Sequence, residues 1–291
     1  MRKKTIKSLI PRKKIKYCKE KIKTYQETKQ IILRLFTQSI RRPSTILISI
    51  IQPLIWLIIF SALFYKAPLQ LFENKITNYK EFLNPGIIIF TAFNSSINAG
   101  LTVIFDREFG FLNRILISPI SNKKSIMYGS IIHTWTITII QIIGITNIAL
   151  HKNTTFNFSN IIISLIVISI ITISISNLSI YSAFILPGHI EFIGITTIFF
   201  NTPTLFTSTA LAPLSFMPQW LQIICCINPL TYGIEIIRNI NSNNIFSLKQ
   251  LIINTSYLLI NGYQGFTILL VTNIISFILV KNMLNYKYDK N

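Results

Sequence analysis

The residue types that usually carry catalysis are scarce in this sequence. The 291 residues include three His and nine acidic residues, and only Glu191 lies clearly inside an apolar segment long enough to cross a membrane. No two His share a helical face at the spacing of metal or haem ligands, and no Ser, His and Asp form a set suited to nucleophilic catalysis. Cys225 and Cys226 are adjacent and are interpreted as small apolar residues. We therefore expect neither catalysis nor a bound metal.

Nucleotide chemistry is not expected in this chain either. Its ten Gly never form the G-x-x-x-x-G-K-[ST] pattern, whose backbone amides cradle phosphates. If ATP drives the protein, ATP and Mg²⁺ must bind to a separate polypeptide. The chain itself is expected to bind no cofactor.

Hydroxyl and amide side chains repeat at helical spacing inside two apolar segments. One stripe has four members at i, i+4, i+7 and i+11: Thr91, Ser95, Asn98 and Thr102. The second stripe repeats that spacing: Thr197, Asn201, Thr204 and Ser208. Because polar groups need partners in hydrocarbon, both stripes are predicted to face other helices or a wet pathway. Two interpretations stay open, namely interhelical hydrogen bonds of about 0.6 kcal/mol each or a path for an amphipathic substrate.

The composition indicates which elements must position these residues. The chain is 51% hydrophobic and 13% charged, with a mean hydropathy of +0.53, whereas a soluble domain has about a quarter of its residues charged. The sequence therefore predicts an all-α polytopic membrane protein. A spanning helix needs about 20 apolar residues, and six stretches qualify: residues 46–65, 86–105, 126–150, 161–184, 190–211 and 266–280. The last stretch is short, and we expect it to extend back through residues 258–260.

The basic residues predict the orientation. Residues 1–45 contain 15 of the 28 Lys and Arg residues, and the positive-inside rule then places both termini on the cytoplasmic or stromal side. Within this region, apolar residues recur every three or four positions and predict an amphipathic helix on the membrane surface, in contact with lipid: Ile22, Tyr25, Ile32, Leu35 and Phe36. The net charge of +19 comes mainly from this tail rather than from a folded basic surface. Nucleic acid is therefore not the expected partner.

Two loops have more pattern than a simple connector. After the second stretch, apolar residues at i, i+4, i+7 and i+11 predict one helix, which Pro119 would end: Phe105, Phe109, Leu112 and Leu116. Its charged residues, Arg107, Glu108 and Arg114, would be presented to a soluble partner. On the opposite side, residues 212–262 are too apolar for a loop, and the short apolar segment Leu221–Ile227 predicts a re-entrant or interfacial pair of helices.

These loops resemble type-2 ABC transporter permeases. The stretch Asp-Arg-Glu-x-Gly-x-Leu-x-Arg-Ile-Leu-x-Ser-Pro-Ile, residues 106–120, looks like the cytosolic signature loop of that family. Met-Pro-Gln-Trp-Leu from Met217, and Asn-Pro-Leu-Thr-Tyr-Gly-x-Glu-x-Ile-Arg from Asn228, resemble its external motif. Gln-Pro-Leu-Ile-Trp-Leu-Ile-Ile-Phe-Ser from Gln52 resembles the drug-export branch. The resemblance covers the chain from about Gln30 to its end, and it divides the chain into a basic tail with a connecting helix (1–45), a six-span permease domain (46–280) and a second basic tail (281–291).

The resemblance implies the permease subunit of an ATP-driven exporter. Two copies, most simply a homodimer, would each dock one ATP-binding cassette subunit. It implies a set of coupling residues: Arg107, Glu108, Gly110, Arg114 and Pro119. It also implies an external structural motif: Pro218, Trp220, Asn228, Pro229, Tyr232, Glu235 and Arg238. The composition favours residues with A/T-rich codons, and no targeting sequence is evident. In both respects the chain is similar to permease-like reading frames of red-algal plastids, and a bacterial plasma membrane is the alternative location.

A second hypothesis comes from a different class. The chain would then be a membrane tether or assembly factor without transport, whose basic N-terminus binds RNA or ribosomes. The sequence assigns no role to residues 1–24 and names no substrate. A membrane enzyme is the third alternative, and the scarcity of His and acidic residues in the apolar stretches argues against it.

Overall fold

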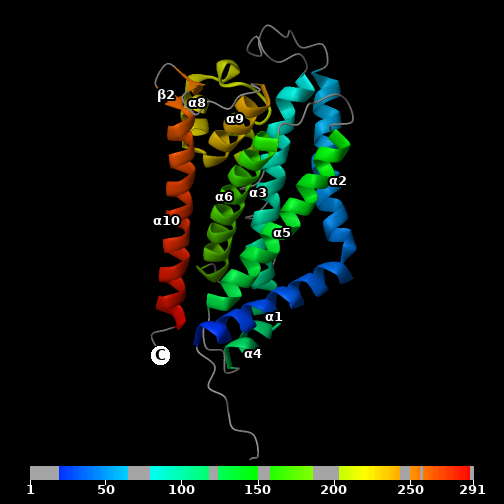
Figure 1. The fold of residues 1–291 in the computed structure, drawn as a ribbon, viewed down its shortest axis with the longest axis vertical. Helices are drawn as coiled ribbons and strands as arrows, with labels where there is room; N and C mark the ends of the chain where they lie inside the picture. Colours follow the sequence, from blue (N-terminus) through cyan, green and yellow to red (C-terminus); the bar gives the residue numbers. More distant parts are fainter. Residues whose placement is uncertain are drawn as a thin grey trace, which may run out of the picture.

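A computed structural model describes residues 20–64, 79–117, 124–149, 158–185, 203–242, 250–255 and 258–288. Most of these residues form helices that run side by side in one bundle (Figure 1). The first six helices are α1 (Glu20–Arg41), α2 (Pro43–Leu63), α3 (Tyr79–Glu108), α4 (Phe111–Ile117), α5 (Lys124–Ala149) and α6 (Phe158–Ile185). A 3-10 turn at Leu214–Phe216 precedes α8 (Gln219–Ile227), α9 (Pro229–Ser242) and α10 (Gly262–Tyr288), and the strands β1 (Leu251–Asn254) and β2 (Leu259–Asn261) pair antiparallel.

Five of the described helices are long and apolar enough to cross a membrane, namely α2, α3, α5, α6 and α10. The count rises to 6 if α8 and α9, which are bent by 89° at their junction, form one broken span. This confirms the all-α polytopic prediction and five of the predicted stretches. Most of the predicted stretch 190–211 lies outside the described residues, and a short helical turn at 203–206 belongs to its described end.

The boundaries of the last helix differ from the prediction. Residues 258–260 do not extend α10, because residues 259–261 pair with β1. The side chain of Gln264 accepts the backbone N–H of Asn261 at 3.0 Å, and α10 begins at the next residue, Gly262. At its other end α10 continues to Tyr288, because Val280 and Leu284 extend its buried face into the core. Most of the predicted tail 281–291 is therefore helix.

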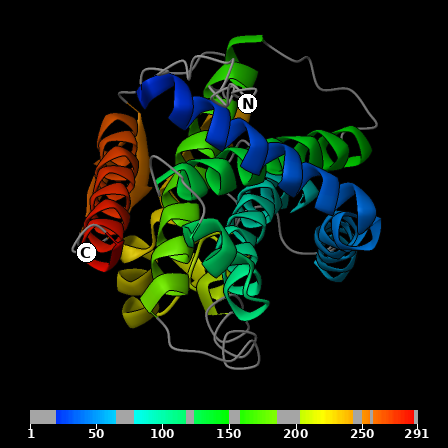
Figure 2. The ribbon, with the colours of Figure 1, turned by 90° about the horizontal axis from the view of Figure 1, so that it is seen from below.

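The two ends of the bundle differ. α1 crosses the ends of the other helices, beside α4 and near the end of α10 (Figures 1 and 2). The sharp turn between α1 and α2 lies at Arg42, which precedes Pro43, and a residue before proline disfavours the helical conformation. α8, α9 and the strands gather at the opposite end (Figure 1). We call these the α1–α4 end and the α8–α9 end.

Helix α3 is the centre of the bundle and packs against α2, α5, α6 and α9. At Gly100 the backbones of α3 and α6 approach so closely that an added Cβ would lie 2.3 Å from the hydroxyl of Ser179. That hydroxyl donates to the carbonyl of Ile97 at 2.7 Å. Small residues at helix contacts allow such approaches in membrane proteins. By contrast, α2 buries only Pro53 and Leu57.

We expect Gly100→Ala to lower the free energy of unfolding by about 1–3 kcal/mol, because the new methyl group would force α3 away from α6. Gly144→Ala is the matched control, since an added Cβ at Gly144 meets no other segment among the described residues within 4 Å. The control should be neutral or slightly stabilising, because Ala is the better helix former. Thermal unfolding of both variants in the same detergent measures the difference, and equal midpoints would contradict this account of the contact.

Candidate functional site

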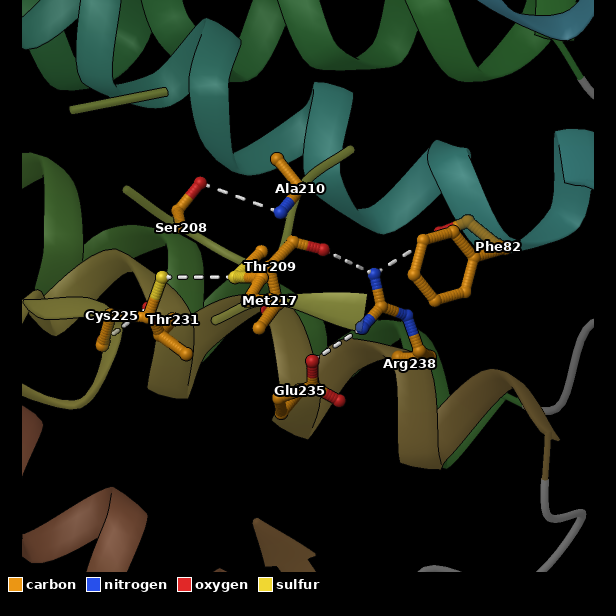
Figure 3. A network of polar contacts seen from close by, with 9 residues as sticks. All are labelled: Phe82, Ser208, Thr209, Ala210, Met217, Cys225, Thr231, Glu235 and Arg238. Atoms are coloured by element: carbon orange, nitrogen blue, oxygen red, sulfur yellow. Dashed lines mark hydrogen bonds and ion pairs between the residues drawn. The ribbon is translucent and has the colours of Figure 1, made fainter. Parts of the chain in front are cut away.

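At the α8–α9 end, Arg238 joins three separate segments. Its guanidinium donates to the carbonyl of Thr209 at 2.8 Å and to that of Phe82 at 3.3 Å, and it forms an ion pair with Glu235. It also lies over the Phe82 ring, 3.8 Å from its centre. Figure 3 shows the side chain extended from α9 between Phe82 of α3 and the segment that contains Thr209. A buried cation requires such partners, so Arg238 fixes α9 against the start of α3.

The bend between α8 and α9 is built around Asn228. Its side-chain amide donates to the carbonyls of Thr204 and Thr207, both at 3.1 Å, and its Oδ1 accepts the backbone N–H of Leu230 at 3.0 Å. The last contact caps the start of α9, where Pro229 occupies the first helical position. The hydroxyl of Tyr232 donates to the carbonyl of Cys226 across the same bend.

Two other predicted residues of the external motif, Pro218 and Trp220, lie at the start of α8. Pro218 precedes α8 and is extended, with φ −63° and ψ 155°. Trp220 is 64% exposed, as expected for a ring at a membrane interface. The predicted pair of helices is therefore confirmed as a bent pair. The sequence did not indicate that Phe82 and Thr209 complete the motif, because they are 156 and 29 residues from Arg238.

A row of aromatic rings connects α2 to the same cluster. Trp56 stacks on Phe60 at 5.3 Å between ring centres, and Phe60 lies 6.4 Å from Phe64. Phe64 contacts Tyr79 at 5.0 Å, and Tyr79 lies 6.0 Å from Phe82. α2 is thus attached to the bundle through rings that end at the Phe82–Arg238 contact.

The predicted coupling segment is broken rather than continuous. α3 ends at Glu108 and α4 begins at Phe111, whereas the apolar spacing predicted one helix across this region. Gly110 has φ +70°, a left-handed conformation that glycine adopts at little cost. The break also divides the predicted apolar face, since Leu112 is 2% exposed but Phe109 is 74% exposed.

The structure places the predicted coupling residues differently. Arg107 turns toward the bundle and donates to the carbonyl of Ala183 at 2.9 Å, near the end of α6, where a cation is favourable. Glu108 and Arg114 are exposed. Pro119 lies outside the described residues. Among the charged members of the set, Glu108 and Arg114 are thus the ones presented on the surface.

α1 is fastened to the bundle beside this segment. Arg34 forms an ion pair with Asp106 of α3, and the Ser39 hydroxyl lies 2.9 Å from Nε2 of His133 on α5. Of the predicted apolar face, Leu35 is buried while Tyr25 is exposed, so this face meets α5 over only part of its length. A helix before the first span agrees with the prediction, and its position on a membrane surface stays a prediction.

Members of the first polar stripe differ in their surroundings: some contact α5, and one is exposed. The hydroxyl of Thr138 on α5 donates to that of Ser95 at 2.8 Å, and Thr102 lies 3.3 Å from the Ser130 hydroxyl on the same helix. Thr91 is buried and donates to Ile87 of its own helix at 2.7 Å. Asn98 is exposed.

Part of the second stripe can be placed. Thr197 and Asn201 lie outside the described residues. Ser208 is buried and donates to the carbonyl of Leu205 at 2.7 Å, and the carbonyl of Thr204 accepts from Asn228.

Comparison with known proteins assigns the family. The model of the family described as "ABC-2 type transporter" matches residues 26–241, which is most of the chain. The chain belongs to the ABC-2 type transporter permease family. This permease is also similar to proteins named "Putative transport permease ycf38": 43% identical over 260 residues in Cyanophora paradoxa (89% of each chain), 40% over 285 residues in Porphyra purpurea (94% of this chain and 95% of the relative) and 43% over 265 residues in Pyropia yezoensis (91% and 90%). A plastid origin fits these relatives.

We expect Arg238→Gln to lower the apparent melting temperature of the permease strongly. Removing one partner of a buried ion pair typically costs about 3–5 kcal/mol, and this change also removes the bonds to two carbonyls. Arg114→Gln, which removes the same charge at an exposed position, should be close to neutral. Size-exclusion chromatography of samples heated to a series of temperatures gives the apparent melting temperature of each variant. Similar melting temperatures would show that Arg238 does not fix the α8–α9 end.

Proposed function

We propose that this permease is the membrane subunit of an ATP-driven exporter, in which two copies pair and each docks one ATP-binding cassette subunit. Members of the family normally work with such a subunit. The observation that carries the proposal is the exposed, charged segment at the α3–α4 break, beside α1 and at one end of the membrane-crossing helices. The sequence has no phosphate-binding loop of its own. ATP and Mg²⁺ would therefore bind to the partner.

The continuity of α3 supports a mechanical coupling. This helix has 30 residues and is therefore about 45 Å long. It connects exposed Glu108 at one end to the Phe82–Arg238 contact at the other. A displacement of the α1–α4 end by the ATP-binding subunit would thus reach the α8–α9 end through one continuous helix. Coupling between distant sites requires such a physical connection.

The substrate path would follow the polar stripes, and Asn98 is its best-placed described member. An exposed amide near the middle of a spanning helix has no hydrogen-bonding partner in hydrocarbon, so it would face water or the second copy. Thr91, Ser95 and Ser208 are buried and hydrogen-bonded within the chain, so they would support the wall behind Asn98. Thr204, Thr197 and Asn201 would be the further members that line the path. An amphipathic substrate suits such a lining. The proposed location is a plastid membrane, with both termini in the stroma.

We expect Glu108→Lys to prevent recovery of the ATP-binding subunit while the permease still inserts. The reversed charge would face the partner at the α3–α4 break. Glu81→Lys is the matched control, because it reverses the same charge at an exposed position of the same helix at the opposite end. Affinity purification of tagged variants from membranes in mild detergent, with mass spectrometry of the bound proteins, is the measurement.

Deletion of residues 2–24 separates this proposal from a tether. A permease should still recover the ATP-binding subunit after the deletion. Loss of all partners on deletion, with no effect of Glu108→Lys, would favour the tether and contradict the proposed function.

We expect a cysteine at position 98 to react with a membrane-impermeant maleimide in the assembled complex. Asn98→Cys would be compared with Ile274→Cys, an apolar position on α10 that is 59% exposed and would face lipid. Cys18, Cys225 and Cys226 would be replaced by Ala in both variants. Labelling at position 98 and protection at position 274 would support a wet path, whereas equal protection would count against it.

A further inference from the structure

The break between α3 and α4 is a short turn at Gly110, held locally by the backbone hydrogen bonds Gly110 N–H to Arg107 O and Arg114 N–H to Gly110 O. At Gly110 the chain takes a left-handed turn, and an added Cβ would meet none of the described residues beyond its chain neighbours within 4 Å. α4 has only 7 residues, fewer than an isolated helix needs to be stable in water. Contacts from elsewhere in the protein must therefore set the direction of α4.

Arg34 of α1 contacts both sides of this break. Its guanidinium pairs with both carboxylate oxygens of Asp106, in a contact that includes a hydrogen bond of 3.1 Å to Oδ1. The same group lies over the ring of Phe111, with its central carbon 4.2 Å from the ring centre. Asp106 is in the last turn of α3, and Phe111 is the first residue of α4. One planar group thus contacts both helices, and Leu112 of α4 also packs in the core with residues of α3 and α5.

The chemistry of this contact requires arginine. A guanidinium can bind a carboxylate through two parallel N–H groups while its face lies on an aromatic ring. A lysine ammonium is a compact charge and cannot reproduce both contacts. The side chains of Arg34 and Asp106 are 28% and 15% exposed, so water screens this pair only in part.

α1 provides a fixed support for Arg34. One turn further along α1, Ser39 and Phe36 both contact His133 of α5, with the Phe36 and His133 ring centres 5.0 Å apart. Toward the start of α1, an added Cβ at Gly129 of α5 would lie 2.7 Å from the side chain of Ile31. Contacts on both sides of Arg34 therefore hold α1 on α5.

We propose that Arg34 is a positioning residue that sets the angle between α3 and α4. It would hold α4 in the direction that presents Glu108 and Arg114 together to a soluble partner. Only this consequence rests on the proposed function, because the angle itself is a property of the permease alone. Movement of α1 would then redirect α4, so the two elements that face the partner would respond as one unit.

Distance measurements between spin labels on α1 and α4 test the proposal. Labels at Lys29→Cys and Ile117→Cys, both at exposed positions, would be attached in the purified full-length protein with Cys18, Cys225 and Cys226 replaced by Ala. The doubly labelled protein with Arg34 intact should give one narrow distance distribution. Arg34→Gln should broaden it, because α4 loses its contact with α1.

Two further variants make the result specific to the guanidinium. Arg34→Lys keeps the charge but not the planar group, and it should also broaden the distribution. Arg41→Gln removes an exposed charge from the same helix and should leave the distribution narrow. If both Arg34 variants instead give the narrow peak of Arg41→Gln, the proposal is overturned. This measurement needs no ATP-binding subunit, so its failure is distinguishable from failure of the proposed function, which partner recovery tests.

Discussion

The contact of Arg238 with Glu235, Phe82 and Thr209 is the interaction on which the α8–α9 end depends. A guanidinium in an apolar bundle needs partners for its charge within the protein, and here its two terminal nitrogens find them on α9, α3 and the segment before α8. At the opposite end, Arg34 pairs with Asp106 in the last turn of α3. α3 is therefore held by a cation near each end, and the long helices α2, α5 and α6 pack around it.

This arrangement gives the permease one continuous helix, α3, between two sites of different character. The α1–α4 end presents charged and aromatic groups, including Glu108, Arg114 and Phe109. The α8–α9 end is closed by hydrogen bonds to backbone carbonyls around Asn228. In the account proposed above, ATP-driven movement enters at the first end, and α3 transmits it to the second. In the same account, the close contact of Gly100 with Ser179 would move α6 together with α3.

The sequence predicted those features that depend on composition and short-range spacing. The sequence predicts the apolar stretches of α2, α3, α5 and α6 because a span requires about 20 apolar residues. It predicts the pair α8–α9 because the apolar run Leu221–Ile227 is too short to cross a membrane. The break at Gly110 was missed, because the apolar spacing of Phe105, Phe109 and Leu112 continues across it. The contacts of Arg34 with Asp106 and of Thr138 with Ser95 join residues 72 and 43 positions apart. No local pattern in the sequence indicates such pairs.

Native mass spectrometry of the complex extracted from membranes in mild detergent tests the central claim most directly. The account predicts one main species that contains two copies of this permease and two copies of an ATP-binding subunit with a phosphate-binding loop. A permease recovered with ribosomal proteins or RNA and without any ATP-binding subunit would contradict the account. The basic N-terminus would then be the active part of the molecule.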